Sequence, residues 1–545
     1  MSYKNKKILA VVPARGGSKG IPKKNVRMLC GKPLILHVLH TLSKVHFIDK
    51  IVVTTDDDQI AWISQKVPNV EIINRTKKLS NDNVTLDPVI IDAYKKLAKK
   101  EEFDFIFTFQ PTSPLISVSS IKKSIQKLIN SKNDSLLSVV DDRHLRWSGT
   151  CDNPVMLFKE RKNRQDLEPV YKETGAIIAC SRETLLSGSR IGKKIELMEL
   201  PQKESIDVDH FNDWMLAEQI LKMPKIAFIV IGSRSKGLGH VYRALTIAQH
   251  FNVRPIFYIR KSEKIAAKKV KESFYEVREF HSDEELDNLL FKDDINLIIN
   301  DTLDTSVHYI NLLKNNNRFV VSFEDFGEGV ENAHLVFNAL YESSHKRKNK
   351  YFGYRYFCLR DEFVFAQKKI VSNEVKKILI TFGGTDQNNL SKFIFDCLKD
   401  TNYEIDIIVG PGYSEFKKLK GYIGKRASVH QSVERMSDYM LNADIIITSN
   451  GRTTFEAASL GVPSIAIAQN EREMKHLFGD VTGTIINLGL CQKVDKNMFL
   501  QSFYNLVQSP QKRKDINKRM LKLNLQNGIH LVINKILNEY NEFKK

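Results

Sequence analysis

Short apolar runs alternate with helical stretches along the chain, and this pattern begins twice, each time with a glycine-rich loop. The first beginning has apolar runs over 8–13, 50–55 and 104–109, and the glycine-rich loop ARGGSKG directly follows the first of them. At the second beginning, the run over 225–232 leads into a glycine-rich loop that ends at His240. Such runs, rich in β-branched and aromatic residues, are typical of strands buried on both faces, and their alternation with helices predicts parallel sheets. The sequence therefore predicts more than one α/β unit in a single polypeptide.

The length of the chain supports a division into several units. Its 545 residues are too many for one hydrophobic core. We expect a first unit over 1–222, closed by a helix near 211–222 and followed by Pro224, which ends that helix. Two further sets of strands divide the remainder into 225–372 and 373–545, and helices form the end of the last part. The predicted fold class is α/β, with three sheets in sequence.

Composition narrows the classes of function. Hydrophobic residues make up 42% and charged residues 27% of the chain, as in soluble globular proteins. No apolar run approaches the roughly 20 residues that span a bilayer, and no cleavage signal follows the N-terminus, so we expect a cytoplasmic protein without a membrane span. The six cysteines form no CxxC pair, which favours reduced thiols. The formal net charge of +19 comes from lysines spread over many helices, and it suits small anionic substrates such as nucleotides rather than nucleic acid.

Polar motifs follow predicted strands of the first unit, at the edge where open parallel sheets bind ligands. In PARGGSKGIPKKN the glycines let backbone amides approach a phosphate chain, and Arg15, Lys19 and Lys24 add positive charge. The loop matches neither the P-loop nor the dinucleotide-binding fingerprint. Asp207 and Asp209 lie two residues apart on an expected strand, so both carboxylates would face one side and could hold Mg²⁺ together with substrate phosphates. A solvated acidic turn would have the same spacing.

The first 222 residues resemble the CMP-nonulosonate cytidylyltransferases, the family that includes CMP-sialic acid synthetase. The motifs PARGGSKGIPKKN, VVTTDD, LSND, QPTSP, RQDL, TGA and IDVD carry the resemblance and occur in this order. It implies a Rossmann-like nucleotidyltransferase sheet, a homodimer, and attack by the anomeric hydroxyl of a sialic-acid-like nine-carbon acid on the α-phosphate of CTP, with Mg²⁺ as cofactor. The implied site residues are Arg15, Ser18, Lys19, Lys24, Asn25, Arg75 and Asp82 for CTP, Asp207 and Asp209 for the metal, and Gln110 and Arg164 for the acid.

Three positions expected around the acceptor sugar depart from this family pattern. Ile116 stands where an arginine usually follows QPTSPL, Thr174 replaces the asparagine of NGA, and Ile178 replaces a common tyrosine. The cytidylyl transfer is still expected, but the sequence leaves open which nonulosonic acid is the acceptor.

The second beginning of the pattern places His240 at the tip of GLGHVYR and Arg243 one helical turn further on. A helix N-terminus at this point favours a diphosphate, and glycine keeps side chains out of its way. A lone histidine is more often a structural residue. However, two later segments, TFGGTDQNN and SNGRTTFEAASLGVPS, also end strands with polar residues and begin helices. They indicate the second side of a ligand cleft.

Residues 225–500 resemble the GT-B-like UDP-sugar hydrolase of pseudaminic acid biosynthesis and its relatives of spore-coat polysaccharide synthesis. GLGHVYR, CLRDEF, FGGTD and GRTTFEAASLGVPSI carry this resemblance. It implies two facing Rossmann-like halves with a UDP-amino sugar between them. His240 would be the general base that activates water, a role that suits histidine because it ordinarily titrates near neutral pH. The implied ligand-binding residues are Thr453 and Thr454 for the diphosphate, Glu456 for the ribose and Arg243 for the substrate.

The hydrolase pattern is also incomplete. Ile229 and Ile231 stand where Arg-x-Asp is usual, Asp301 is followed by TLD instead of His-Tyr, and Glu324 with Asp325 replaces two aspartates. The sequence therefore leaves three functions open. The chain could be a bifunctional cytidylyltransferase and UDP-sugar hydrolase, a cytidylyltransferase fused to a glycosyltransferase that needs an acceptor, or one fused to a module that binds a nucleotide sugar without turnover.

Overall fold

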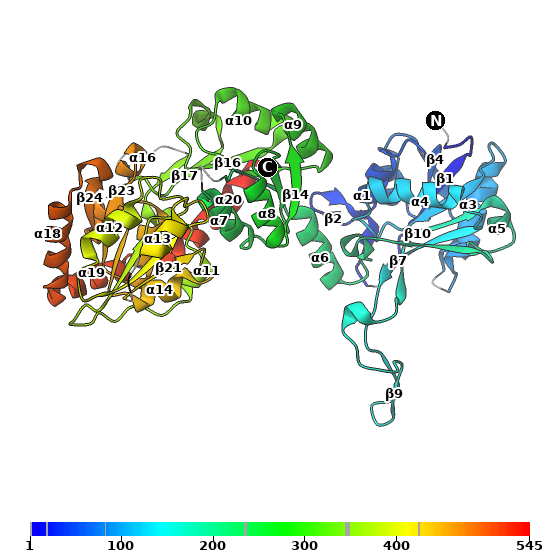
Figure 1. Ribbon diagram of the computed structural model, residues 1–545. Helices are drawn as coiled ribbons and strands as arrows, with labels where there is room; N and C mark the ends of the chain where they lie inside the picture. Colours follow the sequence, from blue (N-terminus) through cyan, green and yellow to red (C-terminus); the bar gives the residue numbers. More distant parts are fainter. Residues whose placement is uncertain are drawn as a thin grey trace. The chain divides into compact units, whose positions relative to one another are not determined.

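The computed structural model describes residues 3–17, 20–81, 83–233, 237–343, 349–422, 424 and 426–544 (Figure 1). The chain divides into two compact units, Met1–Met223 and Pro224–Lys545. Within the described ranges, no helix combines the length and apolar character that crossing a membrane requires.

The first unit is built on a seven-stranded sheet with the order β11-β7-β10-β6-β1-β4-β5. All pairings are parallel except those of β10, which runs antiparallel to both of its neighbours. The expected runs over 8–13, 50–55 and 104–109 form three adjacent strands at its centre. The strands are β1 (Ile8–Pro13), β4 (Lys50–Thr55), β5 (Val70–Asn74), β6 (Phe105–Phe109), β7 (Ser135–Asp141), β10 (Tyr171–Ser181) and β11 (Ile195–Glu199).

Helices cover both faces of this sheet because successive side chains of a strand point to opposite sides. Ile8, Ala10 and Val12 of β1 pack in one core, and Leu9 and Val11 pack in the other. The helices α1, α2 and α4 contribute to the first core, and α3 and α5 contribute to the second. The helices are α1 (Leu34–Leu42), α2 (Asp58–Ser64), α3 (Leu86–Ala98), α4 (Val118–Asn130), α5 (Arg182–Leu186) and α6 (Phe211–Lys222).

The segment between β7 and β10 projects away from the sheet of the first unit (Figure 1). It carries a small antiparallel pair, β8 (Trp147–Gly149) and β9 (Pro154–Met156). Several of its large apolar side chains are exposed, namely Trp147, Val155, Met156 and Leu157. The sequence motifs did not indicate this projection.

The second unit contains two entirely parallel sheets, a seven-stranded one with the order β14-β13-β12-β15-β16-β17-β18 and a six-stranded one with the order β21-β20-β19-β22-β23-β24. We call them the first and second halves. The strands of the first half are β12 (Ile226–Val230), β13 (Ile256–Arg260), β14 (Glu276–Phe280), β15 (Leu297–Asp301), β16 (Phe319–Phe323), β17 (Leu335–Asn338) and β18 (Lys350–Phe352). Those of the second half are β19 (Lys377–Thr381), β20 (Glu404–Val409), β21 (Ala427–Gln431), β22 (Ile445–Ser449), β23 (Ser464–Ala468) and β24 (Ile485–Leu490).

Helices connect most successive strands in both halves and form the crossovers that parallel pairing requires, whereas the turn η6 (Glu328–Asn332) lies between β16 and β17. Several begin at a side-chain cap, as at Ser282, Ser306 and Asp495, whose side chains accept a backbone N–H of the first turn. The helices are α7 (Gly239–Ala248), α8 (Lys264–Glu272), α9 (Asp283–Lys292), α10 (Val307–Lys314), α11 (Asp361–Val364), α12 (Leu390–Leu398), α13 (Phe416–Tyr422), α14 (Met436–Asn442), α15 (Arg452–Leu460), α16 (Glu471–Met474), α17 (Phe478–Thr482), α18 (Lys496–Val507), α19 (Pro510–Lys522) and α20 (Gly528–Phe543).

The last helix, α20, packs on the first half, although the sequence assigned the C-terminal helices to the second half. Val532 and Ile536 of α20 are fully buried in one core with Phe228 and Phe319 of the first sheet. The Tyr540 hydroxyl also donates a hydrogen bond to the Asn296 side-chain oxygen at 2.7 Å. Figure 1 shows α20, in red, among the green elements of the first half. The chain therefore passes between the halves twice.

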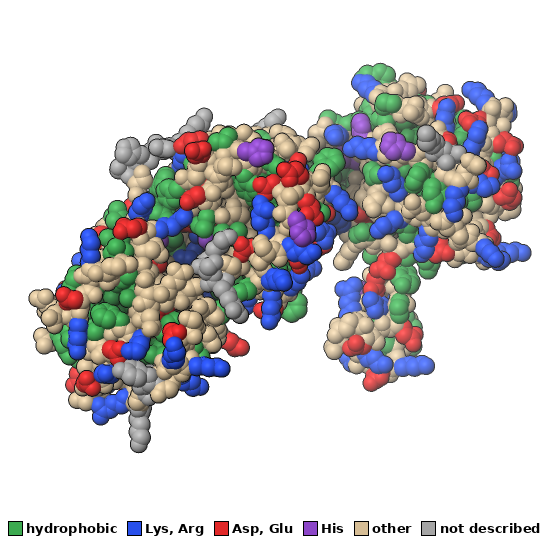
Figure 2. Space-filling view, turned by 45° about the horizontal axis from the view of Figure 1, so that its top comes forward, with side chains coloured by type: hydrophobic (Ala, Val, Ile, Leu, Met, Phe, Trp, Pro, Cys, Tyr) green, Lys and Arg blue, Asp and Glu red, His purple; other side chains and the backbone are tan. Residues whose placement is uncertain are grey.

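Charged side chains of both signs are mixed on the surface. On the face drawn in Figure 2, Lys and Arg side chains are interspersed with Asp and Glu over each unit. The positive net charge is thus distributed on this face and is not gathered in one basic patch.

Candidate active sites

The carboxyl ends of β1, β5 and β6 open into a cavity of about 380 Å³ in the first unit. Loops that follow parallel strands meet at this edge of a sheet, so residues distant in sequence come together here. The residues expected from the sequence that line the cavity are Arg15, Lys24, Asn25, Arg75, Gln110 and Asp209. One site thus combines cations, amides and a carboxylate.

Two hydrogen bonds hold the start of the glycine loop of this site. The Asn25 side-chain amide donates to the Arg15 carbonyl at 3.0 Å, and the Gly16 amide donates to Asp56 at 3.0 Å. A side chain at Gly20 would collide with the backbone carbonyl of Asp209. Glycine is therefore required where the loop passes the carboxylate segment.

Asp207 and Asp209 lie in irregular backbone between the short 3-10 turn η4 (Gln202–Ser205) and α6, and not on the expected strand. The strand prediction is wrong because only an isolated contact, from the Val208 amide to the Thr112 carbonyl at 2.8 Å, ties the segment to its neighbour. Lys24 Nζ reaches across and donates to the Val208 carbonyl at 2.7 Å and to Asp209 Oδ1 at 2.9 Å. The lysine thus joins the glycine loop to the carboxylates.

The Asp207 carboxylate is suited to a metal ion. Its Oδ1 is buried without a hydrogen-bond partner among the described residues, and burial raises the pKa of Asp207, with the nearby charge of Asp209 acting in the same direction. No cluster of three or more metal-ligating side chains occurs in the described part of the chain. A Mg²⁺ ion here would therefore need substrate phosphates to complete its coordination, as is usual for this ion.

Arg75 and Gln110 form the inner wall of the first cavity. Arg75 is buried and donates to the Thr54 carbonyl at 2.9 Å, while its Nε has no partner among the described residues. Burial lowers the pKa of Arg75. Gly175 has a φ of +70°, and a Cβ at this position would lie 2.8 Å from Gln110 Nε2. The glycine of the TGA motif therefore provides space for the glutamine.

Other residues expected at the first site lie elsewhere. Arg164 is exposed on the projecting segment, in the turn η3 (Arg164–Asp166), and does not line the cavity of its own chain. Ile116, Thr174 and Ile178 are buried away from the cavity lining, and the Thr174 hydroxyl contacts that of Ser138 at 2.7 Å. Ser18, Lys19 and Asp82 lie outside the described residues.

A larger cavity, of about 740 Å³, lies between the two halves of the second unit. Loops after β12, β19 and β22 line it, so both sheets contribute their carboxyl ends. The glycine loops of the halves approach each other closely, since a Cβ on Gly384 would lie 3.7 Å from the Gly237 Cα. Three residues expected from the sequence line this cavity, namely His240, Thr453 and Glu456.

His240 is held by a buried carboxylate at the wall of this cavity. Its Nδ1 lies 2.6 Å from Asp301 Oδ1, and Arg243 binds the same carboxylate through Nε at 2.7 Å and Nη2 at 2.5 Å. Asp301 and Arg243 are 1% and 4% exposed. Burial alone would raise the pKa of Asp301, but the Arg243 charge and the hydrogen bonds lower it well below its ordinary value. Since an ionised carboxylate only accepts, Nδ1 is the donor in this contact, and in the neutral imidazole Nε2 is then the acceptor.

Glu324 completes this group of buried charges. Its Oε1 accepts from the Ala339 amide at 3.0 Å and lies 3.4 Å from Arg243 Nη1. Burial raises the pKa of Glu324, and the Arg243 charge opposes the rise. Arg243 itself does not line the cavity, so its described contacts are with carboxylates and not with a substrate position. Sequence reasoning noted Asp301 and Glu324 only as departures from a pattern; acidic residues at the ends of two predicted strands were the available signal.

The second half supplies the opposite wall. Arg360 holds Glu456 through Nε at 3.1 Å and Nη2 at 3.0 Å, and this fixes the carboxylate at the cavity. Thr453 lines the cavity, whereas the Thr454 hydroxyl is buried and donates to the Gly451 carbonyl at 2.7 Å. Thr454 therefore stabilises the start of α15.

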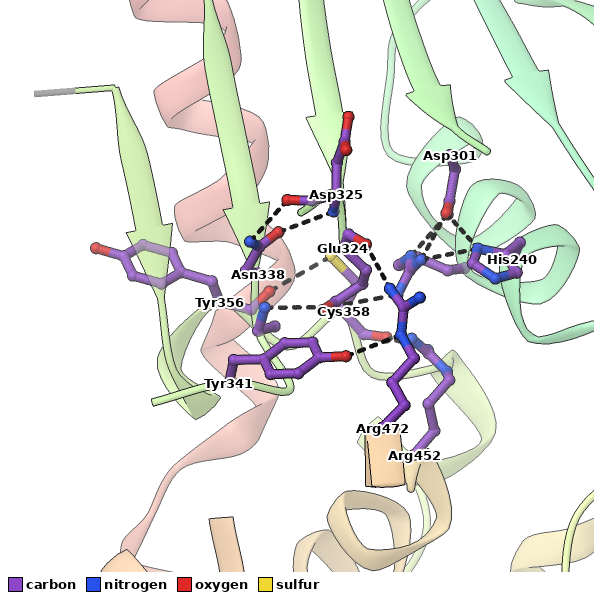
Figure 3. A network of polar contacts seen from close by, with 12 residues as sticks. His240, Asp301, Glu324, Asp325, Asn338, Tyr341, Tyr356, Cys358, Arg452 and Arg472 are labelled. Atoms are coloured by element: carbon purple, nitrogen blue, oxygen red, sulfur yellow. Dashed lines mark hydrogen bonds and ion pairs between the residues drawn. The ribbon is translucent and has the colours of Figure 1, made fainter. Parts of the chain in front are cut away.

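Two arginines that sequence reasoning missed extend from the second half toward the first (Figure 3). Arg472 donates to the Tyr341 hydroxyl at 3.0 Å and to the Glu324 carbonyl at 3.1 Å. Arg452 donates to the Cys358 carbonyl at 3.3 Å. Arg472 thus connects α16 to the loop that holds Glu324, and Arg452 connects α15 to the segment of Cys358.

The sheets and cavities define an α/β protein in which a nucleotidyltransferase-like unit precedes a GT-B-like pair of Rossmann-like domains. Residues 9–228 match the cytidylyltransferase family, and residues 377–479 match the glycosyltransferase family 28 C-terminal domain. The chain belongs to the cytidylyltransferase family, and its second unit carries a glycosyltransferase family 28 C-terminal domain.

Individual relatives match the chain in part. CMP-N,N'-diacetyllegionaminic acid synthase of Legionella pneumophila is 31% identical over 234 residues, which are 41% of this chain and 100% of the relative. N-acylneuraminate cytidylyltransferase A of Danio rerio is 30% identical over 40% of this chain and 51% of its own length. An uncharacterized protein of Methanocaldococcus jannaschii is 30% identical over 45% of this chain and 56% of its own length. The chain thus spans about half the length of the last two relatives.

Proposed function

We propose that the chain is a bifunctional enzyme of nonulosonic acid biosynthesis. Its first unit transfers CMP from CTP to a sialic-acid-like nine-carbon acid, and its second unit hydrolyses a UDP-amino sugar. The observation that carries the first activity is the contact of Lys24 with Asp209 beside the glycine loop, next to the unpartnered oxygen of Asp207. The activities named for the Legionella and Danio relatives agree with it.

In the first unit, the anomeric hydroxyl of the acid attacks the α-phosphorus of CTP. A phosphorus–oxygen bond to the sugar forms, the bond to the bridging oxygen breaks, pyrophosphate leaves with the electron pair, and the hydroxyl proton is released to solvent. Arg15 and Lys24 orient the triphosphate and offset its charge, which is the main protein contribution in such displacements. Asp207 and Asp209 would hold Mg²⁺, which when bound neutralises phosphate charge.

In the second unit, Asp301 keeps the proton of His240 on Nδ1, so Nε2 can accept a proton from water. The water oxygen bonds to the anomeric carbon, the bond from that carbon to the diphosphate oxygen breaks, and free sugar and UDP are released. Glu456, fixed by Arg360, binds the ribose, and Thr453 contacts the diphosphate. The observation that carries this proposal is the buried His240–Asp301 pair at the wall of a cavity that both halves line.

Glycosyl transfer is the competing function of the second unit, because residues 377–479 match a glycosyltransferase domain. The same histidine would then deprotonate an acceptor hydroxyl instead of water. Release of free sugar and UDP from a UDP-amino sugar without any acceptor supports hydrolysis. Turnover that depends on an added acceptor supports transfer, and tight UDP binding without turnover supports a binding module.

The test of the first activity is pyrophosphate release from CTP with a panel of nonulosonic acids and Mg²⁺. Asp209→Asn should abolish it, whereas Glu183→Gln, a change at an exposed acid of the same unit, should not. Activity retained in Asp209→Asn, or metal-independent activity of the unaltered protein, would contradict the proposed role of the carboxylates.

We also propose a homodimer through the first unit. The exposed apolar side chains of the projecting segment, among them Trp147, Met156 and Leu157, are a surface that a second copy can cover. Arg164 lies on the same segment. In a dimer it could meet the acid at the partner's site, which would reconcile its expected role with its exposure.

A further inference from the structure

Arg452 differs from the other arginines around the cavity of the second unit because no carboxylate in the described part of the chain pairs with it. Arg243 pairs with Asp301, Arg360 with Glu456, and Arg472 with Asp304. Among the described residues, no acidic side chain lies within ion-pair distance of Arg452. A guanidinium that is removed from water without an anion is costly, so an unpaired one in a ligand cavity indicates that a ligand supplies the charge.

The surroundings of Arg452 fix its position but satisfy few of its donors. Its guanidinium lies over the Phe357 ring at 4.6 Å and, within the described ranges, gives one hydrogen bond, to the Cys358 carbonyl. A guanidinium has five N–H donors, so most remain for a ligand. Burial, followed by the like charge of Arg243, lowers the pKa of Arg452 to about 10, which still leaves it charged at neutral pH.

Arg452 belongs to the second half but reaches the reacting end of the cavity. It is the first residue of α15, and a Cβ on Gly239 would lie 3.6 Å from its Cδ. Gly239 directly precedes His240 in the first half. Figure 3 shows the Arg452 side chain extended toward Cys358, on the side of the cavity where Glu324 and His240 lie.

We propose that Arg452 binds an anionic group attached to the anomeric carbon, the carbon attacked by the water that His240 activates. Through this contact the cavity binds ligands with a second anionic group more tightly than simple nucleoside monophosphates. The inference rests on the proposed function in one respect, since the proposed catalytic role of His240 identifies the end of the cavity where the anomeric carbon lies. Two ligands offer such a group. One is the terminal phosphate of a nucleoside diphosphate, and the other is the carboxylate of a CMP-activated nine-carbon acid, the product proposed for the first unit.

Calorimetric binding with the full chain tests the proposal in two arms. The first compares UDP with UMP, and the second compares CMP-N-acetylneuraminic acid with CMP, each for the unaltered protein, Arg452→Met and Arg452→Lys. The matched control is Arg435→Met, an exposed arginine of the same half. In at least one arm, Arg452→Met should reduce the preference for the ligand with the extra anion by about tenfold or more, because charge-assisted contacts to phosphate or carboxylate are strong. Arg452→Lys should retain part of the preference, and the control should retain all of it.

Thermal unfolding without ligand provides a second readout. An unpaired cation destabilises the free protein, so Arg452→Met should unfold at the same or a higher temperature. Unchanged preferences in both arms would overturn the inference, whatever the unfolding temperature. If the unaltered protein shows an Arg452-dependent preference but releases no sugar from UDP-sugars, the hydrolase proposal fails and this inference stands. If it hydrolyses UDP-sugars and Arg452→Met binds all ligands normally, only this inference fails.

Discussion

At the residue scale, the second site depends on one buried carboxylate. Asp301 accepts from both His240 and Arg243, so its negative charge orients the histidine and compensates the arginine. Removing one member of a group of buried charges leaves an uncompensated charge. The resulting loss of stability is larger than the net stability that the intact group contributes. Catalysis and stability are therefore coupled at this position.

Asp301→Asn should lower UDP release by about a hundredfold or more, because an amide can donate to Nδ1 and so stabilise the wrong histidine tautomer. The free energy of unfolding should fall by about 3 kcal/mol, because Arg243 loses its charged partner. UDP release and urea denaturation measure the two effects, with the exposed Asp400→Asn as the control. An Asp301→Asn enzyme of normal activity would exclude the proposed orientation of His240.

At the element scale, the sequence predicted those strands and loops whose own residues show a clear pattern of apolar runs or glycines. Apolar runs predicted several adjacent strands of each sheet, although not every strand of any sheet, and the glycine loops fall at strand ends. Three features could not be predicted, because pairing across the sequence decides them. They are the antiparallel direction of β10, the position of Asp207 and Asp209 outside any strand, and the return of α20 to the first half. The roles of Asp301 and Arg452 likewise depend on contacts between distant elements.

The packing of α20 makes a quantitative prediction. Ile536 is fully buried among first-half side chains, so Ile536→Ala should lower the free energy of unfolding of the second unit by about 3 kcal/mol. Leu531 on the same helix is 46% exposed, and Leu531→Ala should cost less than about 1 kcal/mol. Chemical denaturation of both variants measures the difference. Equal effects would contradict the placement of α20 on the first sheet.

His334 makes the stability of the first half depend on pH. It stacks on Phe319 at 4.6 Å and accepts from the Val320 amide at 2.9 Å, and burial lowers the pKa of His334 from 6.5 to about 4. Between these values the unfolded chain binds a proton that the folded protein does not. The free energy of unfolding therefore falls as the pH drops through this window, whereas above pH 6.5 both states are neutral here and the effect vanishes.

At pH 5 the loss from His334 should be about 1–2 kcal/mol relative to pH 7, after allowance for its partial exposure. His334→Asn keeps an acceptor oxygen but cannot titrate, so its decrease between pH 7 and pH 5 should be smaller by that amount. Denaturation curves at the two pH values provide the comparison. The same decrease in both proteins would show that His334 is not the source.

At the scale of the whole molecule, the projecting segment predicts association. The unaltered protein should elute as a dimer in size-exclusion chromatography with light scattering, because the exposed apolar side chains of this segment are buried on pairing. Met156→Glu should shift it to the monomer, whereas Leu186→Glu, a change at a residue of the same unit that is similarly exposed, should leave the dimer intact. A monomeric unaltered protein, or a dimer unaffected by Met156→Glu, would exclude this interface.

The central claim is that one polypeptide carries two independent nucleotide sites, one in each compact unit. The most direct test measures pyrophosphate release from CTP and UDP release from a UDP-amino sugar in three proteins: unaltered, Asp209→Asn and His240→Ala. Each substitution should abolish one activity and leave the other within about twofold, since the altered groups line separate cavities. Loss of both activities from either substitution would contradict two independent sites.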